Sequence, residues 1–267
     1  MILIKAHGFG NDFLLVDAAH LDGVSDRPTL AREVCERHRG IGADGLMVYE
    51  TTPEGASMQL LNADGSRSEV SGNGVRCLAA WIAIRDGLAR GAVVKVQTEA
   101  GVKALELLDR TGDRSTFRAS MGQPEQIARV PIDVNGERVD AITLRVGNPQ
   151  CVLLGGVTEE RLHTVASALA VHAHFPEGTN VELADVVTKD HVRILIWERG
   201  VGPTEASGTG ACAAAVAAIR FGGAARDVQI ESPGGTQRVE WTDAGLFLTG
   251  WAELIAESTW LKVNKTI

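Results

Sequence analysis

The 267-residue sequence lacks an excess of positive charge. Lysine and arginine together number 26 against 34 aspartates and glutamates, which gives a formal net charge of −8. Proteins that hold the phosphate backbone of nucleic acids carry basic patches, so this balance argues against a nucleic-acid partner. Low-complexity segments are also missing, and 45% of the residues are hydrophobic. The chain is therefore long and apolar enough for one large domain, or for two of about 130 residues.

Cysteine is scarce, and no Cys-x-x-Cys or other metal-binding spacing occurs among Cys35, Cys77, Cys151 and Cys212. The histidines at 172 and 174 have no carboxylate at ligand spacing either. We therefore expect no metal site, and we interpret each cysteine as a small buried hydrophobic residue. A chain without a disulfide pattern fits the reducing cytoplasm.

Long hydrophobic runs are absent as well. The longest, Cys77 to Ile84 and Ala211 to Ile219, are far shorter than the ~20 residues that cross a bilayer. The opening residues Met1 to Lys5 do not have the pattern of a secretory leader. We expect a cytoplasmic protein with no membrane partner.

One short phrase occurs twice. Glu-x-Ser-Gly-(Asn or Thr)-Gly stands at 69–74 and again at 205–210, each time before a cysteine and a run of small apolar residues. A glycine-rich turn that leads into a helix presents backbone N–H groups and the positive end of the helix dipole to an anion. A single copy is equally typical of a tight turn that packs a helix on a sheet. The repetition indicates a duplicated architecture, and it predicts two helix N-termini that face one small anionic ligand.

The hydrophobic pattern predicts a helix after each phrase, at about 74–85 and 210–221, apolar on nearly every side and therefore buried. Strands are expected around both helices. The order of elements predicts an α/β (α+β) fold with two pseudo-symmetric halves, each a curved sheet around a central helix, and a cleft between them. We place the N-terminal half at 1–113 plus 256–267 and the C-terminal half at 114–255, since a strand-like stretch at 259–263 could return to the first half.

Six motifs resemble those of diaminopimelate epimerase, and they occur in that family's order within the region from Lys5 to Cys212. They are Lys5-Ala6-His7-Gly8-Phe9-Gly10-Asn11-Asp12-Phe13, Asn62-Ala63-Asp64-Gly65-Ser66, Gly72-Asn73-Gly74-Val75-Arg76-Cys77, Gly147-Asn148-Pro149, Gly178-Thr179-Asn180-Val181 and Trp197-Glu198-Arg199-Gly200. The resemblance implies interconversion of LL- and meso-diaminopimelate for lysine and peptidoglycan synthesis, without pyridoxal phosphate or another cofactor, by a homodimer.

Inversion of an amino-acid α-carbon needs one base on each face of that carbon, and the family uses a pair of cysteines. The resemblance implies that Arg199 holds a substrate carboxylate and Glu198 an ammonium, as their charges suit. The full set of substrate ligands that it implies is Asn11, Asn62, Gly72, Asn73, Asn148, Asn180, Glu198, Arg199, Gly208 and Thr209.

The sequence departs from the family at both base positions, because the two catalytic cysteines fall on Ser71 and Ser207. These serines are therefore the catalytic candidates. A serine hydroxyl does not titrate in the ordinary range and normally borrows an adjacent base. The nearest carboxylates in the sequence are Glu69 and Glu205, two residues before each serine.

Three further positions differ. Gln150 replaces the histidine of the family phrase Gly-Asn-Pro-His, Gly45 stands where many members carry glutamine, and Pro203 replaces a frequent glutamate. Three accounts of the serines stay open: an engineered trap for a substrate complex, a natural enzyme with slow or different chemistry, or a protein that only binds its ligand. A related racemase, dehydratase or isomerase of the same fold is the rival enzyme.

Overall fold

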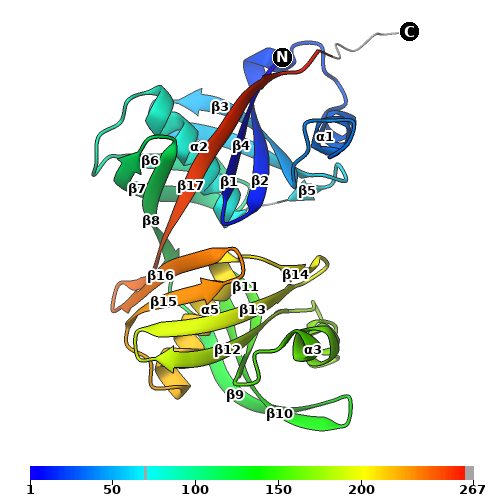
Figure 1. Ribbon diagram of the computed structural model, residues 1–267, viewed down its shortest axis with the longest axis vertical. Coiled ribbons are helices and arrows are strands. Elements are labelled where there is room, and N and C mark those ends of the chain that lie inside the picture. The colour runs from blue at the N-terminus through cyan, green and yellow to red at the C-terminus, as the bar shows by residue number, and fades with distance from the viewer. Residues whose placement is uncertain (69–70, 262–267) are drawn as a thin grey trace. The chain divides into compact units, whose positions relative to one another are not determined.

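The computed structural model describes residues 1–68 and 71–261 (Figure 1). Glu69 therefore lies outside the described residues, and so do 262–267 at the end of the predicted N-terminal half. The chain forms two compact units. Unit 1 comprises Met1–Ala119 and the chain from Gly250 onward, and unit 2 comprises Ser120–Thr249. The limits suggested by the sequence, 113/114 and 255/256, fall at the start of strand β8 and inside strand β17.

Unit 1 is built on a closed ring of strands. Each strand pairs with the next in the order β1–β2–β3–β4–β6–β7–β8–β17, and β17 pairs with β1. Two of these pairs, β2–β3 and β4–β6, are parallel. The strands are β1 (Ile2–Gly8), β2 (Asn11–Asp17), β3 (Gly45–Thr52), β4 (Gly55–Asn62), β6 (Val93–Thr98), β7 (Gly101–Thr111), β8 (Arg114–Gly122) and β17 (Gly245–Thr259), with a two-residue strand β5 (Arg67–Ser68) beside β4.

Unit 2 repeats this arrangement. Its pairs run β9–β10–β11–β12–β13–β15–β16–β17, and the two parallel pairs, β11–β12 and β13–β15, are separated by one antiparallel pair, as in unit 1. The strands are β9 (Glu125–Val134), β10 (Glu137–Val146), β11 (Asn148–Leu154), β12 (Asn180–Thr188), β13 (His191–Glu198), β15 (Asp227–Ser232) and β16 (Gly235–Thr242), with the short β14 (Gly202–Thr204) beside β13. The two pseudo-symmetric halves predicted from the sequence are confirmed.

A central helix provides the parallel crossover in each unit. Helix α2 (Gly72–Arg85) connects β4 to β6, and helix α5 (Gly208–Phe221) connects β13 to β15 (Figure 1). Nearly all residues of both helices are buried, because the curved sheet surrounds them. All four cysteines are buried and free, and Cys77 and Cys212 lie in these two helices. No helix in the described part of the chain is long and apolar enough to cross a membrane.

The remaining helices lie on the other face of the sheets. Helix α1 (Arg27–Cys35) and the 3₁₀ turn η1 (Ala18–Leu21) precede β3. Between β11 and β12, α3 (Glu159–Arg161) continues through the π-helical turn η2 (Leu162–Ala166) into α4 (Ser167–Ala170), as one helical segment. These helices bury a second apolar layer in each unit.

Two elements differ from the sequence-based expectation. Strand β9 was not predicted, because its mostly exposed residues and Pro131 hide the alternation that identifies a half-buried strand. A separate strand-like stretch is expected at 259–263, whereas β17 is one continuous strand that ends at Thr259. Residues 262–263 of this stretch lie outside the described residues.

Candidate functional site

Both candidate serines cap the central helices. Ser71 and Ser207 have extended backbones, with φ of −127° and −137°, and they precede the first residues of α2 and α5. The Ser71 hydroxyl oxygen accepts the N–H of Gly74 at 3.1 Å, and that of Ser207 accepts the N–H of Gly210 at 3.2 Å. A helix leaves its first N–H groups without partners inside the helix. Each serine takes the third N–H, and a helix start of this kind offers the N–H groups of its first two residues to an anion.

Glycine is required at the third position of each helix by close approach. A Cβ atom on Gly74 would lie 2.5 Å from the Met47 methyl carbon, and one on Gly210 would lie 2.6 Å from Oε1 of Glu182. The two helix starts are thus packed tightly against the strands beneath them. This packing accounts for the second glycine of each repeated Gly-x-Gly, whereas a Cβ atom on Gly72 would meet nothing within 4 Å.

The polar residues of unit 1 gather around the start of α2. Asn73 is buried, and its side-chain amide donates to Oδ1 of Asn11 at 3.4 Å. Asn11 in turn donates to the carboxylate of Asp44 at 2.8 Å. Gly45, the residue after Asp44, pairs with Phe13 on β2 and with Asn62 on β4. The sheet register therefore brings the predicted ligands Asn11, Asn62 and Asn73 to one end of the unit, beside Ser71.

An ion-pair network holds Asp44, which accepts the Asn11 amide, in place. Asp12 contacts Lys5 at 3.0 Å and Arg37 at 3.0 Å, and Arg37 also contacts Asp44 at 2.8 Å. Burial raises the pKa of the Asp12 carboxyl, but hydrogen bonds from Arg37 and Lys5 outweigh burial and hold it below its usual value. The network fixes Asp44, and through Asp44 it orients the Asn11 amide.

In unit 2 the strand register produces an equivalent polar row. Gln150 on β11 lies opposite Asn180 on β12. The next residue of that strand, Val181, pairs with Trp197, so Asn180 stands beside Glu198 at the end of β13. Gln150 also donates to Oδ1 of Asn148 at 2.6 Å. The predicted ligands Asn148, Asn180 and Glu198 thus meet at one end of the sheet, and Gln150 lies among them.

Asn180 and Arg199 are connected directly. The side-chain oxygen of Asn180 accepts the backbone N–H of Arg199 at 2.9 Å, and the Arg199 guanidinium donates to the carbonyl of Glu177 at 2.7 Å. Arg199 is exposed, while Asn180 is buried. Asn180 therefore orients the turn that carries Glu198 and Arg199, a role that the motif alone did not reveal.

Glu198, at the end of β13, is the carboxyl group whose pKa responds to Ser207. Burial raises the pKa of Glu198, and the hydrogen bond from Ser207 opposes this shift. The Ser207 oxygen also lies 3.5 Å from the Thr209 hydroxyl. Glu205 is the nearer carboxylate in the sequence, whereas Glu198 comes from the end of β13.

Sequence reasoning missed Glu182. This residue on β12 is fully buried, and neither of its carboxyl oxygens has a hydrogen-bond partner among the described residues. The signal that could have revealed it is a glutamate inside the apolar strand Val181 to Ala184, two residues after Asn180 and hence on the same face.

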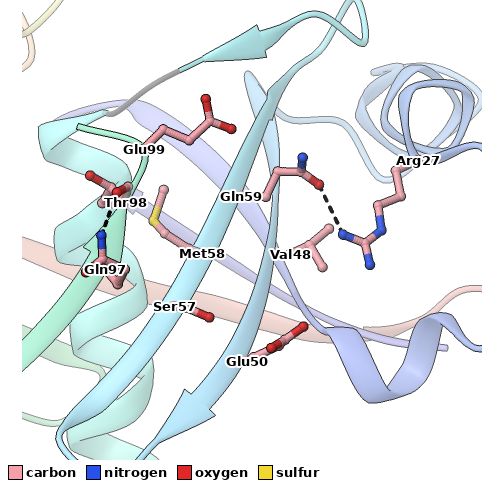
Figure 2. A pocket seen from close by; sticks show the side chains of 9 residues that line it. All are labelled: Arg27, Val48, Glu50, Ser57, Met58, Gln59, Gln97, Thr98 and Glu99. Carbon is pink, nitrogen blue, oxygen red and sulfur yellow. Dashed lines mark hydrogen bonds between the residues drawn. The ribbon is translucent and has the colours of Figure 1, made fainter. Parts of the chain in front are cut away.

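A separate surface pocket of about 350 Å³ lies in unit 1 and contains none of the predicted site residues (Figure 2). Arg27 at its rim is already bonded to the Gln59 side chain at 3.1 Å, and the Gln97 amide is bonded to the Thr98 carbonyl at 3.0 Å. Its lining residues are Arg27, Val48, Glu50, Ser57, Met58, Gln59, Gln97, Thr98 and Glu99. Across all the described residues, 1–68 and 71–261, no cluster of three side chains is suited to hold a metal ion.

Comparison with solved structures establishes the fold. A structure described as a predicted epimerase from Pseudomonas aeruginosa superposes with a TM-score of 0.74 at 18% identity, over 98% of this chain and 99% of that one. A probable proline racemase from Agrobacterium radiobacter gives 0.69 at 17% identity, over 97% and 92%. These similarities concern the fold alone.

Sequence comparison is more specific. Diaminopimelate epimerase of Desulforudis audaxviator is 40% identical over 281 residues, covering 98% of this chain and all of that protein. The enzyme of Moorella thermoacetica is 40% identical over 267 residues, covering 94% and 95%. The family profile described as diaminopimelate epimerase matches residues 3–127 and 142–255, which include both serine-capped helix starts and all the predicted ligands. With matches of this extent, the chain belongs to the diaminopimelate epimerase family.

Proposed function

We propose that this protein is a cofactor-independent epimerase that interconverts LL- and meso-diaminopimelate. The observation that carries the proposal is the matched pair of helix starts, each with a serine cap and a group of asparagines at the same end of its unit. Family membership supplies the substrate, since the relatives are diaminopimelate epimerases.

The two helix starts supply electrostatics for the reaction. The N–H groups of Gly72 and Asn73, and of Gly208 and Thr209, suit a substrate carboxylate, because the positive end of the helix dipole lies there. The same donors stabilise the negative charge that develops on the carboxylate side of the α-carbon when its proton leaves. Arg199 provides the charge for a second carboxylate of this long zwitterionic substrate.

Ser71 and Ser207 occupy the proposed base positions, and they are not equivalent. Interaction with Ser207 lowers the pKa of Glu198, and we infer that Glu198 exchanges a proton through the Ser207 hydroxyl. Among the described residues, the hydrogen bond of the Ser71 side chain is to the backbone of Gly74, which takes up no proton. We infer that proton exchange on the Ser207 side is faster than on the Ser71 side.

This asymmetry also favours a second candidate function, ligand binding without turnover. Inversion requires a competent group on each face of one α-carbon, and within residues 1–68 and 71–261 the Ser71 hydroxyl is bonded to the Gly74 backbone. Incubation with LL-diaminopimelate in heavy water separates the two functions. Deuterium at the α-carbon together with the meso product supports the epimerase. Calorimetric binding with no exchange over days supports the binder, and neither binding nor exchange rejects both.

The resemblance also supports a homodimer in the cytoplasm. The four buried free thiols suit a reducing compartment. Sedimentation equilibrium of the purified protein tests the homodimer, since a monomer at micromolar concentration contradicts it.

A further inference from the structure

Glu182 is the buried titratable group that the proposed chemistry does not use. Its side chain has 0% exposure, on the face of β12 that packs against α5. Both carboxyl oxygens are buried without hydrogen-bond partners among the described residues. Oε1 lies 2.6 Å from the position of a Cβ atom on Gly210. The carboxyl group is therefore directed at the first turn of α5, which Ser207 caps.

Few ionisable groups act on Glu182. From β13 comes Glu198, and from β11 comes the buried thiol of Cys151. Strand β16 contributes the neutral amide of Gln237, which donates to the Ser207 carbonyl at 3.4 Å. Among the described residues, no cation hydrogen-bonds to the Glu182 carboxyl. Burial first, and the charge of Glu198 second, raise the pKa of Glu182 well above its usual value.

Ionisation of Glu182 next to Glu198 would be unfavourable for two reasons. An unpaired carboxylate in the interior loses its hydration, and two neighbouring carboxylates repel each other. A carboxylate beneath the first turn would also neutralise the helix dipole at the place where a ligand carboxylate is expected. With Glu182 protonated, the repulsion between the Glu182 and Glu198 carboxylates disappears. The positive end of the α5 dipole then remains available for the ligand.

We propose that Glu182 is a positioning residue held as a neutral carboxylic acid beneath the first turn of α5, and that its ionisation ends carboxylate binding at this helix start. The binding part rests on the proposed function, which supplies a carboxylate ligand. The protonation part depends on the fold alone.

The protonation part is tested first, without any ligand. Between the pKa of an unfolded glutamate, about 4.3, and the higher folded pKa, the folded state holds one proton that the unfolded state has lost. Over this range the group alone raises the unfolding equilibrium constant about tenfold per pH unit. Glu182→Gln removes this dependence, so its stability gain over the parent protein grows with pH from 5 to 8. Glu125→Gln, which removes an exposed carboxyl of the same unit, is the matched control.

Infrared difference spectra give an independent reading of the same group. We expect the carbonyl band of a protonated carboxylic acid at pH 7 in the parent protein and in Glu125→Gln, and its loss in Glu182→Gln. A constant stability difference between pH 5 and 8, or spectra without this band, would overturn the proposal.

The binding part uses calorimetric titration with meso-diaminopimelate from pH 6 to 9.5. The affinity of the parent protein should fall about tenfold per unit once Glu182 ionises, whereas Glu182→Gln should retain affinity over that range. The amino groups of the ligand titrate equally in both experiments, so the difference between the two proteins isolates Glu182. Parallel profiles would overturn the binding part. If no variant binds at any pH, the proposed function fails, while the infrared and stability data still decide the protonation of Glu182.

Discussion

The side-chain oxygen of Asn180 accepts the backbone N–H of Arg199 at 2.9 Å, and this contact joins the first residue of β12 to the residue that follows β13. It fixes the turn that presents Arg199, while the Arg199 guanidinium is held on the carbonyl of Glu177. We therefore expect Asn180 and Arg199 to act together on a ligand.

A double-mutant cycle tests whether Asn180 acts on the ligand through Arg199. Asn180→Ala and Arg199→Ala should each weaken diaminopimelate binding by ~1–3 kcal/mol, through loss of a hydrogen bond to a charged or oriented group. The double variant should lose less than the sum, with a coupling of at least ~0.5 kcal/mol. Calorimetric titration of the four proteins gives the coupling. Strictly additive losses would show that Asn180 does not act through Arg199.

Restoration of cysteine tests the base positions. Changing both Ser71 and Ser207 to cysteine should raise the epimerisation rate by ~10²–10⁴-fold, because a thiol at a helix start has a pKa near neutrality and a hydroxyl does not. Ser207→Cys alone should speed α-proton exchange more than inversion. Exchange is followed by deuterium incorporation and inversion by chiral separation. Ser71→Ala and Ser207→Ala, which remove the hydroxyl without adding a thiol, are the controls. A double cysteine variant no faster than the parent would indicate that another departure, such as Gln150, has ended the chemistry.

The close packing at the two helix starts should make Gly210→Ala more costly than Gly74→Ala. The new methyl at 74 meets the end of the flexible Met47 side chain, whereas the one at 210 meets the fully buried carboxyl of Glu182. We expect Gly210→Ala to lose ~1–3 kcal/mol of unfolding free energy and Gly74→Ala to lose less. Adding Glu182→Ala to Gly210→Ala should recover part of the loss, because the opposing carboxyl is then gone. Denaturant titration measures all four proteins, and equal losses at the two glycines would contradict the geometry.

Low pH should lower the stability of unit 1, because it protonates Asp12. The pKa of Asp12 is lower in the folded protein than in the unfolded chain. Its contribution to the free energy of unfolding is therefore complete above the unfolded pKa of about 3.9. This contribution is lost as the pH falls through the folded pKa. Asp12→Asn should cost ~1.5–3 kcal/mol at pH 7, and the difference from the parent should shrink below pH 4. Thermal unfolding between pH 2.5 and 7 checks this, with the exposed Asp22→Asn as the control. A difference that persists undiminished at pH 2.5 would place the effect in packing and not in charge.

The sequence by itself determined the architecture. The repeated Ser-Gly-x-Gly phrase and the all-apolar segments after it predicted two buried helices in matching halves, and the structure confirms both. These signals are local: a capping serine, a close-packed glycine and an apolar period lie within a few residues of one another. The ordered motifs identified the family for the same reason, because each motif is a short turn with its own chemistry.

Only the tertiary structure decided which polar groups interact. Gln150, Asn180 and Glu198 are dozens of residues apart, and the strand register places them in one row. The carboxyl whose pKa responds to Ser207 is Glu198 on β13, although Glu205 is nearer in sequence. Glu182 differs from a surface glutamate only by burial, and burial depends on strands and a helix that enclose it from elsewhere in the chain. A pKa depends on solvation and on charges nearby in space, which is why local sequence could not supply it.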